Sequence, residues 1–182
     1  MTPVNNFRRV ARLVYNFAMN DDPDALTQRL ATQLLAKRHS ACTAESCTGG
    51  LIAKTFTDLA GSSDWFERGF VTYSNAAKSE MLGVPAPVID DYGAVSEAVA
   101  TAMASGALRH SLADYSVAVT GVAGPGGGSD EKPVGTVWIA VASKYQASAR
   151  LYHFDGDRQM VREATLQAAI EVLLDLVETA AA

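Results

Sequence analysis

Apolar residues recur at spacings of three and four along much of the chain, which is the pattern of amphipathic helices. The predicted helices span residues 1–20, 24–39, 51–59, 75–81, 96–110 and 159–179. The run Asn20-Asp21-Asp22-Pro23 separates the first two helices, because such a polar, proline-containing run interrupts helical structure. We therefore expect an N-terminal helical extension over residues 1–22 and one domain over residues 23–182.

Short runs of small, β-branched and aromatic residues lie between these helices and are typical of strands. The predicted strands span residues 40–45, 70–73, 115–120, 134–143 and 147–154. Residues 82–93 and the glycine-rich residues 121–133 are expected to be loops. Helices alternate with strands until two strands follow each other near the end. This order predicts an α/β fold, a three-layer α/β/α sandwich with a mixed, mostly parallel sheet.

Composition indicates which ligands and which cellular location to expect. The chain has 182 residues, 15 basic and 20 acidic, and a formal net charge of −5. This acidic balance disfavours non-specific nucleic-acid binding, although one arginine or helix N-terminus is enough for a small anion. The two cysteines, Cys42 and Cys47, match neither a zinc spacing nor a disulfide framework, so we expect a reducing, cytoplasmic location. No apolar run is long enough to predict a membrane span.

A hydroxyl and two glycines follow the first predicted strand. Ser46 and Thr48 lie where ligands of open α/β sheets bind, and Gly49 and Gly50 allow a helix to begin close by. Such a helix start offers backbone N–H groups to an anion or an oxyanion. Ser46 is therefore a candidate nucleophile, but local sequence alone favours a helix-capping role for Ser46 and Thr48.

A serine nucleophile needs a base. The three histidines lie at helix ends or within a strand, where dipole-facing or structural roles are expected. Lys78 is the candidate among the lysines, because it follows a strand at a helix start with small, uncharged neighbours, and burial lowers a lysine pKa. Tyr73 is placed to pass a proton or to orient Lys78. A surface position for Lys78 remains the alternative, and Lys54 and Lys144 are rivals.

Two further segments could hold a substrate. The glycine-rich run from Thr120 through Gly128 follows a strand, so its backbone N–H groups could approach a phosphate, although a plain surface loop is equally compatible with it. Arg158 opens the last helix and could bind a phosphate or carboxylate, with solvent exposure as the alternative.

Taken together, these segments resemble the CinA C-terminal domain family, which includes stand-alone nicotinamide-nucleotide amidases. The resemblance extends from about Asp24 to the last helix. The motifs that carry it are residues 43–50, 61–75, 93–97, 120–125, 132–137 and 156–158. A chain of this length has no room for the additional N-terminal domain of the larger CinA architecture, so we expect the stand-alone type.

The resemblance implies hydrolysis of nicotinamide mononucleotide to nicotinic acid mononucleotide and ammonia, in pyridine nucleotide recycling. It implies Ser46 as the nucleophile and Lys78 as the base, assisted by Tyr73, without metal or cofactor. It also implies substrate handling by Thr120 and Arg158.

We further expect substrate contacts from the loop segments, and an oxyanion site at the N–H groups near Thr48 and Gly49. The expected substrate-binding set is Thr48, Gly49, Gly50, Thr120, Gly124 and Arg158. A small-molecule nucleotide is the expected partner, in a homo-oligomer without nucleic acid or membrane. The alternative is a non-catalytic nucleotide-binding module of the same fold.

Overall fold

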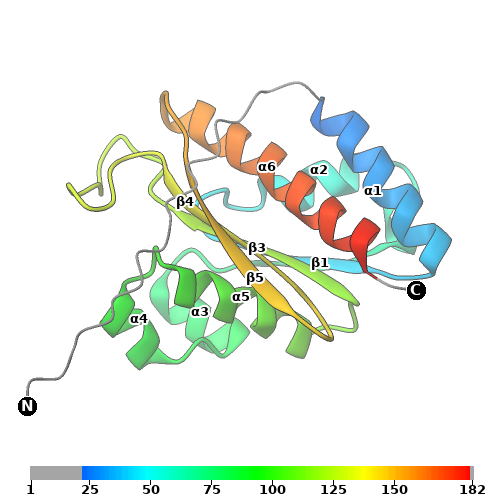
Figure 1. Ribbon diagram of the computed structural model, residues 1–182, viewed down its shortest axis with the longest axis horizontal. Helices are drawn as coiled ribbons and strands as arrows, with labels where there is room; N and C mark the ends of the chain where they lie inside the picture. Colours follow the sequence, from blue (N-terminus) through cyan, green and yellow to red (C-terminus); the bar gives the residue numbers. More distant parts are fainter. Residues whose placement is uncertain (1–21, 181–182) are drawn as a thin grey trace, which may run out of the picture.

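A computed structural model describes residues 22–180 of the chain, so the predicted N-terminal helix lies outside the described residues. Within them, five strands form one sheet in the order β2-β1-β3-β4-β5, with helices on both faces (Figure 1). The strands are β1 (Ala41–Glu45), β2 (Phe66–Val71), β3 (Tyr115–Gly121), β4 (Thr136–Ser143) and β5 (Ala147–His153). The helices are α1 (Pro23–Lys37), α2 (Leu51–Asp58), α3 (Asn75–Leu82), α4 (Ala86–Tyr92), α5 (Glu97–Arg109) and α6 (Arg158–Thr179), with a short 3-10 turn at Ser62–Asp64.

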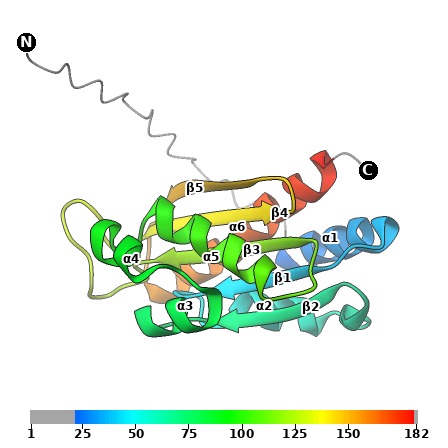
Figure 2. The ribbon, with the colours of Figure 1, turned by 90° about the horizontal axis from the view of Figure 1, so that it is seen from below.

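The sheet is mixed, as predicted. β1 pairs in parallel with both β2 and β3, whereas β4 runs antiparallel to β3 and to β5 (Figure 2). All strands except β4 therefore run in one direction, although parallel and antiparallel pairings are equal in number. The carboxyl ends of β1, β2 and β3 consequently meet at one edge of the sheet.

The two faces of the sheet differ in the size of their side chains. Large residues such as Val117 and Ile139 pack in the core shared with α1, α2 and α6, whereas alanines such as Ala118 and Ala140 face α3, α4 and α5. The small residues let α5 lie close to the sheet. Gly106 of α5 lets α3 approach closely too, because a Cβ there would lie 2.1 Å from the Leu82 carbonyl oxygen.

Two sequence-based assignments were wrong in their bounds. The second strand is residues 66–71 and not 70–73, because Glu67 and Arg68 lie on an edge strand, where charged side chains reach solvent. Residues 86–92 form α4 inside the segment expected to be a loop. Pro85 is the N-cap residue and Pro87 lies in the first helical turn, where the missing N–H has no helical partner in any case.

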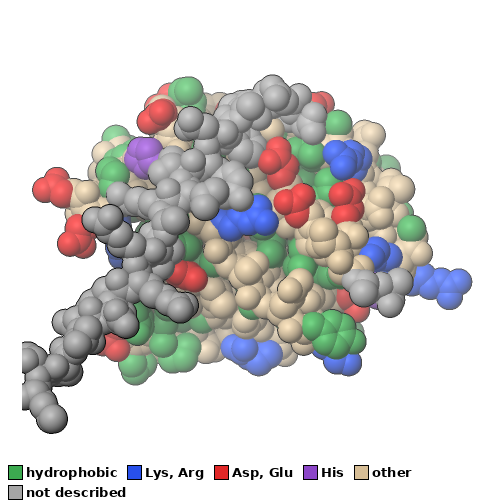
Figure 3. Space-filling model, viewed as in Figure 1, with side chains coloured by type: hydrophobic (Ala, Val, Ile, Leu, Met, Phe, Trp, Pro, Cys, Tyr) green, Lys and Arg blue, Asp and Glu red, His purple; other side chains and the backbone are tan. Residues whose placement is uncertain are grey.

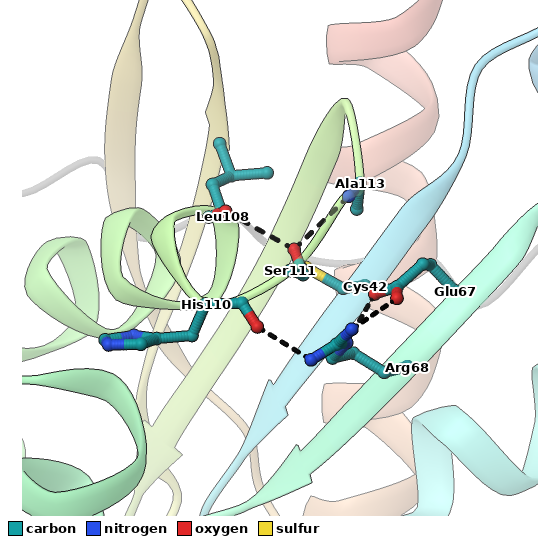
Figure 4. Close-up of polar contacts among 7 residues, drawn as sticks. All are labelled: Cys42, Glu67, Arg68, Leu108, His110, Ser111 and Ala113. Atoms are coloured by element: carbon teal, nitrogen blue, oxygen red, sulfur yellow. Dashed lines mark hydrogen bonds and ion pairs between the residues drawn. The ribbon is translucent and has the colours of Figure 1, made fainter.

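At the amino ends of β1 and β2, opposite the strand ends that carry Ser46, polar contacts link the sheet to the end of α5 (Figure 4). Arg68 pairs with Glu67 and donates a hydrogen bond to the carbonyl oxygen of His110, at the end of α5, over 2.8 Å. Ser111 donates to the sulfur of Cys42 at 3.5 Å. These contacts join β1 and β2 to the end of α5. They hold the layer formed by α3, α4 and α5 against the sheet at the end away from Ser46.

A buried carboxylate sets the start of α2. Glu45, the last residue of β1, has no exposed surface, and its carboxylate accepts hydrogen bonds from the backbone N–H groups of Gly50, Ile52 and Ala53 at 3.0, 3.0 and 2.8 Å. It also accepts from the Thr48 hydroxyl at 2.7 Å. A negative charge at a helix N-terminus is favourable because the helix dipole is positive there. The N-cap residue of α2 is Gly50, and the Glu45 carboxylate accepts from the N–H groups of the first turn, so the capping role that local sequence favoured for Ser46 and Thr48 was wrong.

We predict that Glu45→Gln lowers the free energy of unfolding by about 2–3 kcal/mol, because an amide nitrogen would then face N–H donors in a buried site. Urea denaturation measures this as a lower midpoint with an unchanged slope. The matched control is Glu80→Gln on the exposed surface of α3, which should stay within about 0.5 kcal/mol of the wild type. Equal midpoints for Glu45→Gln and the wild type would contradict the capping role.

Candidate active site

Ser46 lies at the edge where three parallel-running strands end. Its backbone N–H donates to the Val119 carbonyl oxygen at 3.0 Å, and the Thr72 N–H donates to the Glu45 carbonyl oxygen at 2.8 Å. These bonds continue the register of the strands by one residue. Ser46 therefore lies in a row between Thr72, after β2, and Thr120, near the end of β3.

The side chain of Lys78 reaches Ser46 from α3. The Lys78 Nζ lies 3.1 Å from Ser46 Oγ, 3.0 Å from the Thr72 carbonyl oxygen and 3.5 Å from the Tyr73 carbonyl oxygen. Lys78 is only 1% exposed and Ser46 only 8%. Ser74 fixes the start of α3 because its hydroxyl accepts a hydrogen bond from the Ala77 N–H. The structure thus brings together the two residues that the sequence singled out, and it excludes the surface alternative for Lys78.

Burial lowers the pKa of Lys78 from its ordinary value of 10.5, and the nearby Cys47 opposes this shift. Lys78 takes part in no salt bridge within residues 22–180. It also lies in the first turn of α3, where the positive end of the helix dipole disfavours an ammonium. Lys78 Nζ donates to the Ser46 hydroxyl and to the two carbonyls, and loss of one proton would leave a lone pair on the amine to accept the Ser46 proton.

Cys47 is the alternative nucleophile beside Ser46, and its surroundings exclude it. Its side chain packs in the core shared with α6 and is 6% exposed. Burial raises the pKa of its thiol to about 12, although hydrogen bonds from its own N–H and that of Thr48 act in the other direction. A thiol with this pKa stays protonated near neutral pH, so it is a poor nucleophile.

The turn after Ser46 depends on glycine. Gly49 and Gly50 have φ values of 62° and 96°, which residues with a side chain rarely adopt. The Gly49 N–H donates to the Ser46 carbonyl oxygen at 3.1 Å, and the Gly50 N–H donates to Glu45. The N–H that we expected at Gly49 for an oxyanion therefore already has a partner within the turn.

Tyr73 lies next to Arg158 rather than next to the Lys78 amine. Its hydroxyl is 3.2 Å from Arg158 Nη2, and its ring is exposed. Arg158 Nη1 donates to the Gly124 carbonyl oxygen at 2.8 Å. Three residues expected at the site thus form one group, whereas within residues 22–180 no hydrogen bond joins the Tyr73 hydroxyl to Lys78. In this part of the chain, the hydrogen bond between the two residues is accepted by the Tyr73 carbonyl oxygen.

A hydrogen bond to the segment before α5 fixes the position of the Thr120 side chain. Thr120 is 1% exposed, and its hydroxyl donates to the Ala94 carbonyl oxygen at 2.8 Å. This bond ties the segment before α5 to the end of β3. It leaves the oxygen lone pairs of Thr120 as the part of the side chain that could still receive a hydrogen bond.

A cavity of about 790 Å³ is lined by Leu51, the residue directly after the turn formed by residues 46–50 (the serine turn), and by residues of the glycine-rich loop and α6. Its lining comes from the starts of α2 and α6 and from the glycine-rich loop, and includes Leu51, Pro125, Val134, Arg158 and Arg162. Arg162 Nη2 also donates to the Thr48 carbonyl oxygen at 2.7 Å, so this arginine joins α6 to the serine turn.

Sequence reasoning missed Arg162, although its position four residues after Arg158 would have placed both arginines on one helix face.

Three features of the described residues bear on nucleic-acid, membrane and metal binding. On the face shown in Figure 3, acidic and basic side chains are interspersed, and the basic ones do not form a stripe among the described residues. No helix between residues 22 and 180 is long and apolar enough to cross a membrane. In the same part of the chain, no group of three or more His, Cys, Asp or Glu side chains is placed to hold a metal ion.

Comparison with known proteins finds relatives over most of the chain that share one name. The chain is 51% identical over 149 residues to the nicotinamide-nucleotide amidohydrolase PncC of Escherichia coli K12, covering 81% of this chain and 90% of that protein. It is 55% identical over 146 residues to the protein of the same name from Enterobacter agglomerans, covering 80% of this chain and 87% of that protein.

Solved structures of proteins with similar sequences have the same fold. A competence/damage-inducible protein from Agrobacterium tumefaciens superposes with a TM-score of 0.83 at 45% identity, over 88% of this chain and 98% of that one. A CinA-superfamily protein from Escherichia coli superposes with a TM-score of 0.85 at 39% identity, over 90% and 95% of the two chains. The sequence model of the family described as the CinA C-terminal domain matches residues 23–177. The chain therefore belongs to the CinA C-terminal domain family.

Proposed function

We propose that this chain is a nicotinamide-nucleotide amidohydrolase, with Ser46 as the nucleophile and Lys78 as the base. It hydrolyses the carboxamide of nicotinamide mononucleotide to nicotinic acid mononucleotide and ammonia, in pyridine nucleotide recycling. The observation that carries the chemistry is the 3.1 Å contact between the buried Lys78 amine and the Ser46 hydroxyl. The names of the relatives that match most of the chain support the substrate.

In the first half of the reaction, neutral Lys78 takes the proton from the Ser46 hydroxyl as the oxygen attacks the carboxamide carbon. The carbonyl oxygen of the substrate becomes negatively charged in the tetrahedral intermediate and needs N–H donors. When the intermediate collapses, the carbon–nitrogen bond breaks, and the Lys78 ammonium returns a proton to the leaving nitrogen, which departs as ammonia. Ser46 then holds the nicotinoyl group as an ester.

In the second half, water replaces ammonia. Lys78 is neutral again and takes a proton from a water molecule as it attacks the ester carbon. The bond to Ser46 Oγ breaks, the serine regains a proton from Lys78, and the carboxylate product leaves. The same amine thus acts as base and as acid in each half, which requires a pKa near the working pH. The depressed pKa of Lys78 moves it in that direction.

The phosphate of the substrate is assigned to the cavity beside the serine turn. Arg158 and Arg162 line this cavity beside Asp157 and Glu163, and each arginine uses part of its guanidinium on a protein oxygen, which leaves further N–H donors. Arginine matches phosphate geometry well. Leu51 and Val134 add apolar surface to the same lining. In this arrangement Tyr73 holds Arg158 rather than transferring the proton.

A non-catalytic nucleotide-binding module is the alternative. It would use the same cavity and would not need a buried amine next to a hydroxyl, which costs folding free energy. Binding of the nucleotide without release of ammonia by the folded protein would favour this alternative. A homo-oligomeric state and a cytoplasmic location stay predictions.

We predict that Ser46→Ala lowers kcat by roughly a thousandfold or more, because no other hydroxyl contacts Lys78 within hydrogen-bond distance in the described residues. Ammonia release from nicotinamide mononucleotide in the presence of a metal chelator is the measurement. Cys47→Ala is the matched control next to it, and most of the activity should remain. Loss of activity in the cysteine variant together with survival in the serine variant would reverse the assignment of the nucleophile.

We predict that kcat/KM rises with pH along a single ionisation centred below 10.5, the ordinary pKa of a lysine side chain. Burial lowers the pKa of Lys78, so the fraction of neutral amine grows as pH rises through that lowered value. Below it the ammonium cannot accept the Ser46 proton. A rate profile flat across this range would show that no lysine acts as the base.

We predict that Arg158→Gln raises KM for nicotinamide mononucleotide by about tenfold or more, with a smaller effect on kcat, because a charge-assisted bond to phosphate is lost. Nicotinamide riboside, which lacks the phosphate, should be hydrolysed equally by the variant and the wild type. Arg29→Gln, at an exposed pair with Glu178, serves as the control for loss of one positive charge. An equal defect on both substrates would assign Arg158 to the positioning of Tyr73 instead.

A further inference from the structure

Arg162 joins the cavity to the turn that carries Ser46. It lies on α6, and its Nη2 donates a hydrogen bond to the Thr48 carbonyl oxygen at 2.7 Å. The same side chain lines the cavity of about 790 Å³. It is half-buried, so the protein holds one part of the guanidinium while another part stays accessible. One side chain therefore contacts both the serine turn and the space assigned to the phosphate.

The bond from Arg162 reaches the backbone of Ser46 through a single peptide unit. This unit contains the Thr48 carbonyl group, which accepts from Arg162, and the Gly49 N–H, which donates to the Ser46 carbonyl oxygen at 3.1 Å. A peptide unit is planar, so the direction of its carbonyl fixes the direction of its N–H. Arg162 thus helps to fix the backbone of the candidate nucleophile.

Hydrogen bonds, rather than packing, set the direction of this peptide unit. Gly49 and Gly50 have φ values of 62° and 96°, and a Cβ on Gly49 would meet no described atom within 4 Å. Packing therefore leaves room for the peptide to turn. The Thr48 hydroxyl is held by Glu45 at 2.7 Å, and the Thr48 carbonyl oxygen is held by Arg162 on the other side.

The positive charge of Arg162 has no carboxylate partner within residues 22–180. Two acidic side chains line the same cavity, but both are exposed and bonded elsewhere. Asp157 accepts from the N–H groups of Gln159 and Met160, and Glu163 accepts from the Gln159 amide at 2.7 Å. A half-buried guanidinium without a counter-charge favours an anionic ligand such as a phosphate.

We propose that Arg162 is a positioning residue that couples the substrate phosphate to the nucleophile, by binding the phosphate and the Thr48 carbonyl oxygen with two parts of one guanidinium. The inference rests on the proposed function and names how the phosphate acts on that site. A bound phosphate fixes the guanidinium, which in turn fixes the peptide unit that holds Ser46. Binding energy from a group remote from the amide is thereby used to raise kcat. No covalent bond is made or broken at Arg162.

Arg158 is the matched comparison on the same helix. It lies four residues earlier, on the same face of α6, and lines the same cavity. Within residues 22–180 its side chain bonds to Gly124 and Tyr73 and not to the serine turn. Loss of Arg158 should therefore act mainly on KM, and loss of Arg162 mainly on kcat.

The kinetic test compares nicotinamide mononucleotide with nicotinamide riboside, which lacks the phosphate. We expect Arg162→Gln to lower the ratio of the two kcat values by about fivefold or more, with a smaller change in KM, because the phosphate no longer acts on the turn. This ratio does not depend on the folded fraction of the variant. Equal losses on both substrates would overturn the proposal, since Arg162 would then be a structural tie. A higher KM with an unchanged kcat would overturn it as well.

A second readout needs no hydrolysis. Ribose 5-phosphate carries the phosphate without the amide, and in the wild type it should slow hydrogen exchange of the Gly49 N–H by about fivefold or more, as followed by NMR. The Ile52 N–H, which donates to Glu45, is the internal control and should not change.

The same probe should slow this exchange in Arg158→Gln once a higher concentration saturates binding, and should leave it unchanged in Arg162→Gln. These signals would be seen even if nicotinamide mononucleotide were not hydrolysed, so failure of the proposed function is recognised separately. Exchange at Gly49 that the probe leaves unchanged in the wild type, or slows equally in Arg162→Gln, would overturn the coupling.

Discussion

A lysine amine buried among backbone carbonyls, without a salt-bridge partner in residues 22–180, is the constraint on which the rest of the site depends. Lys78 is almost wholly buried, and its nitrogen contacts two backbone carbonyls and the Ser46 hydroxyl. Burying a charge without a partner is costly, so burial lowers the pKa of Lys78, as the proposed role of base requires. The fold must therefore bring α3 close to the end of β1, and the close approach of α3 to α5 at Gly106 meets this need.

The serine side of the contact depends on a second buried group. Glu45 ends β1 and binds the N–H groups at the start of α2, which fixes the turn that presents Ser46. Successive residues of the strand thus take opposite roles: the Glu45 side chain enters the layer of α2, and the Ser46 side chain meets α3. Arg162 adds a tie from α6 to the carbonyl oxygen of Thr48. Two layers of helices and the sheet edge consequently converge on one hydroxyl.

Much of this arrangement could be predicted from the sequence. Periodicity predicted most helices and strands, and a strand end followed by glycines marked Ser46. The contact of Ser46 with Lys78 joins positions 32 residues apart, so local sequence made Lys78 one candidate among the lysines, and the resemblance to a family singled it out. The role of Glu45 was missed because a glutamate after a strand has no local signal for a buried helix cap. Tyr73 was expected at the base, but the direction of its ring depends on Arg158, which is distant in the chain. The second strand was misplaced because its charged residues lie on an edge.

The central claim is that Lys78 activates Ser46, and covalent labelling of the serine tests it most directly. A small sulfonyl fluoride reacts with a serine whose proton a neighbouring base removes. After digestion, mass spectrometry should locate one adduct on Ser46 in the wild type, formed faster as pH rises, and almost none in Lys78→Met, which keeps a long apolar side chain. Equal labelling of Ser46 in both proteins, or labelling of another residue in its place, would contradict the account.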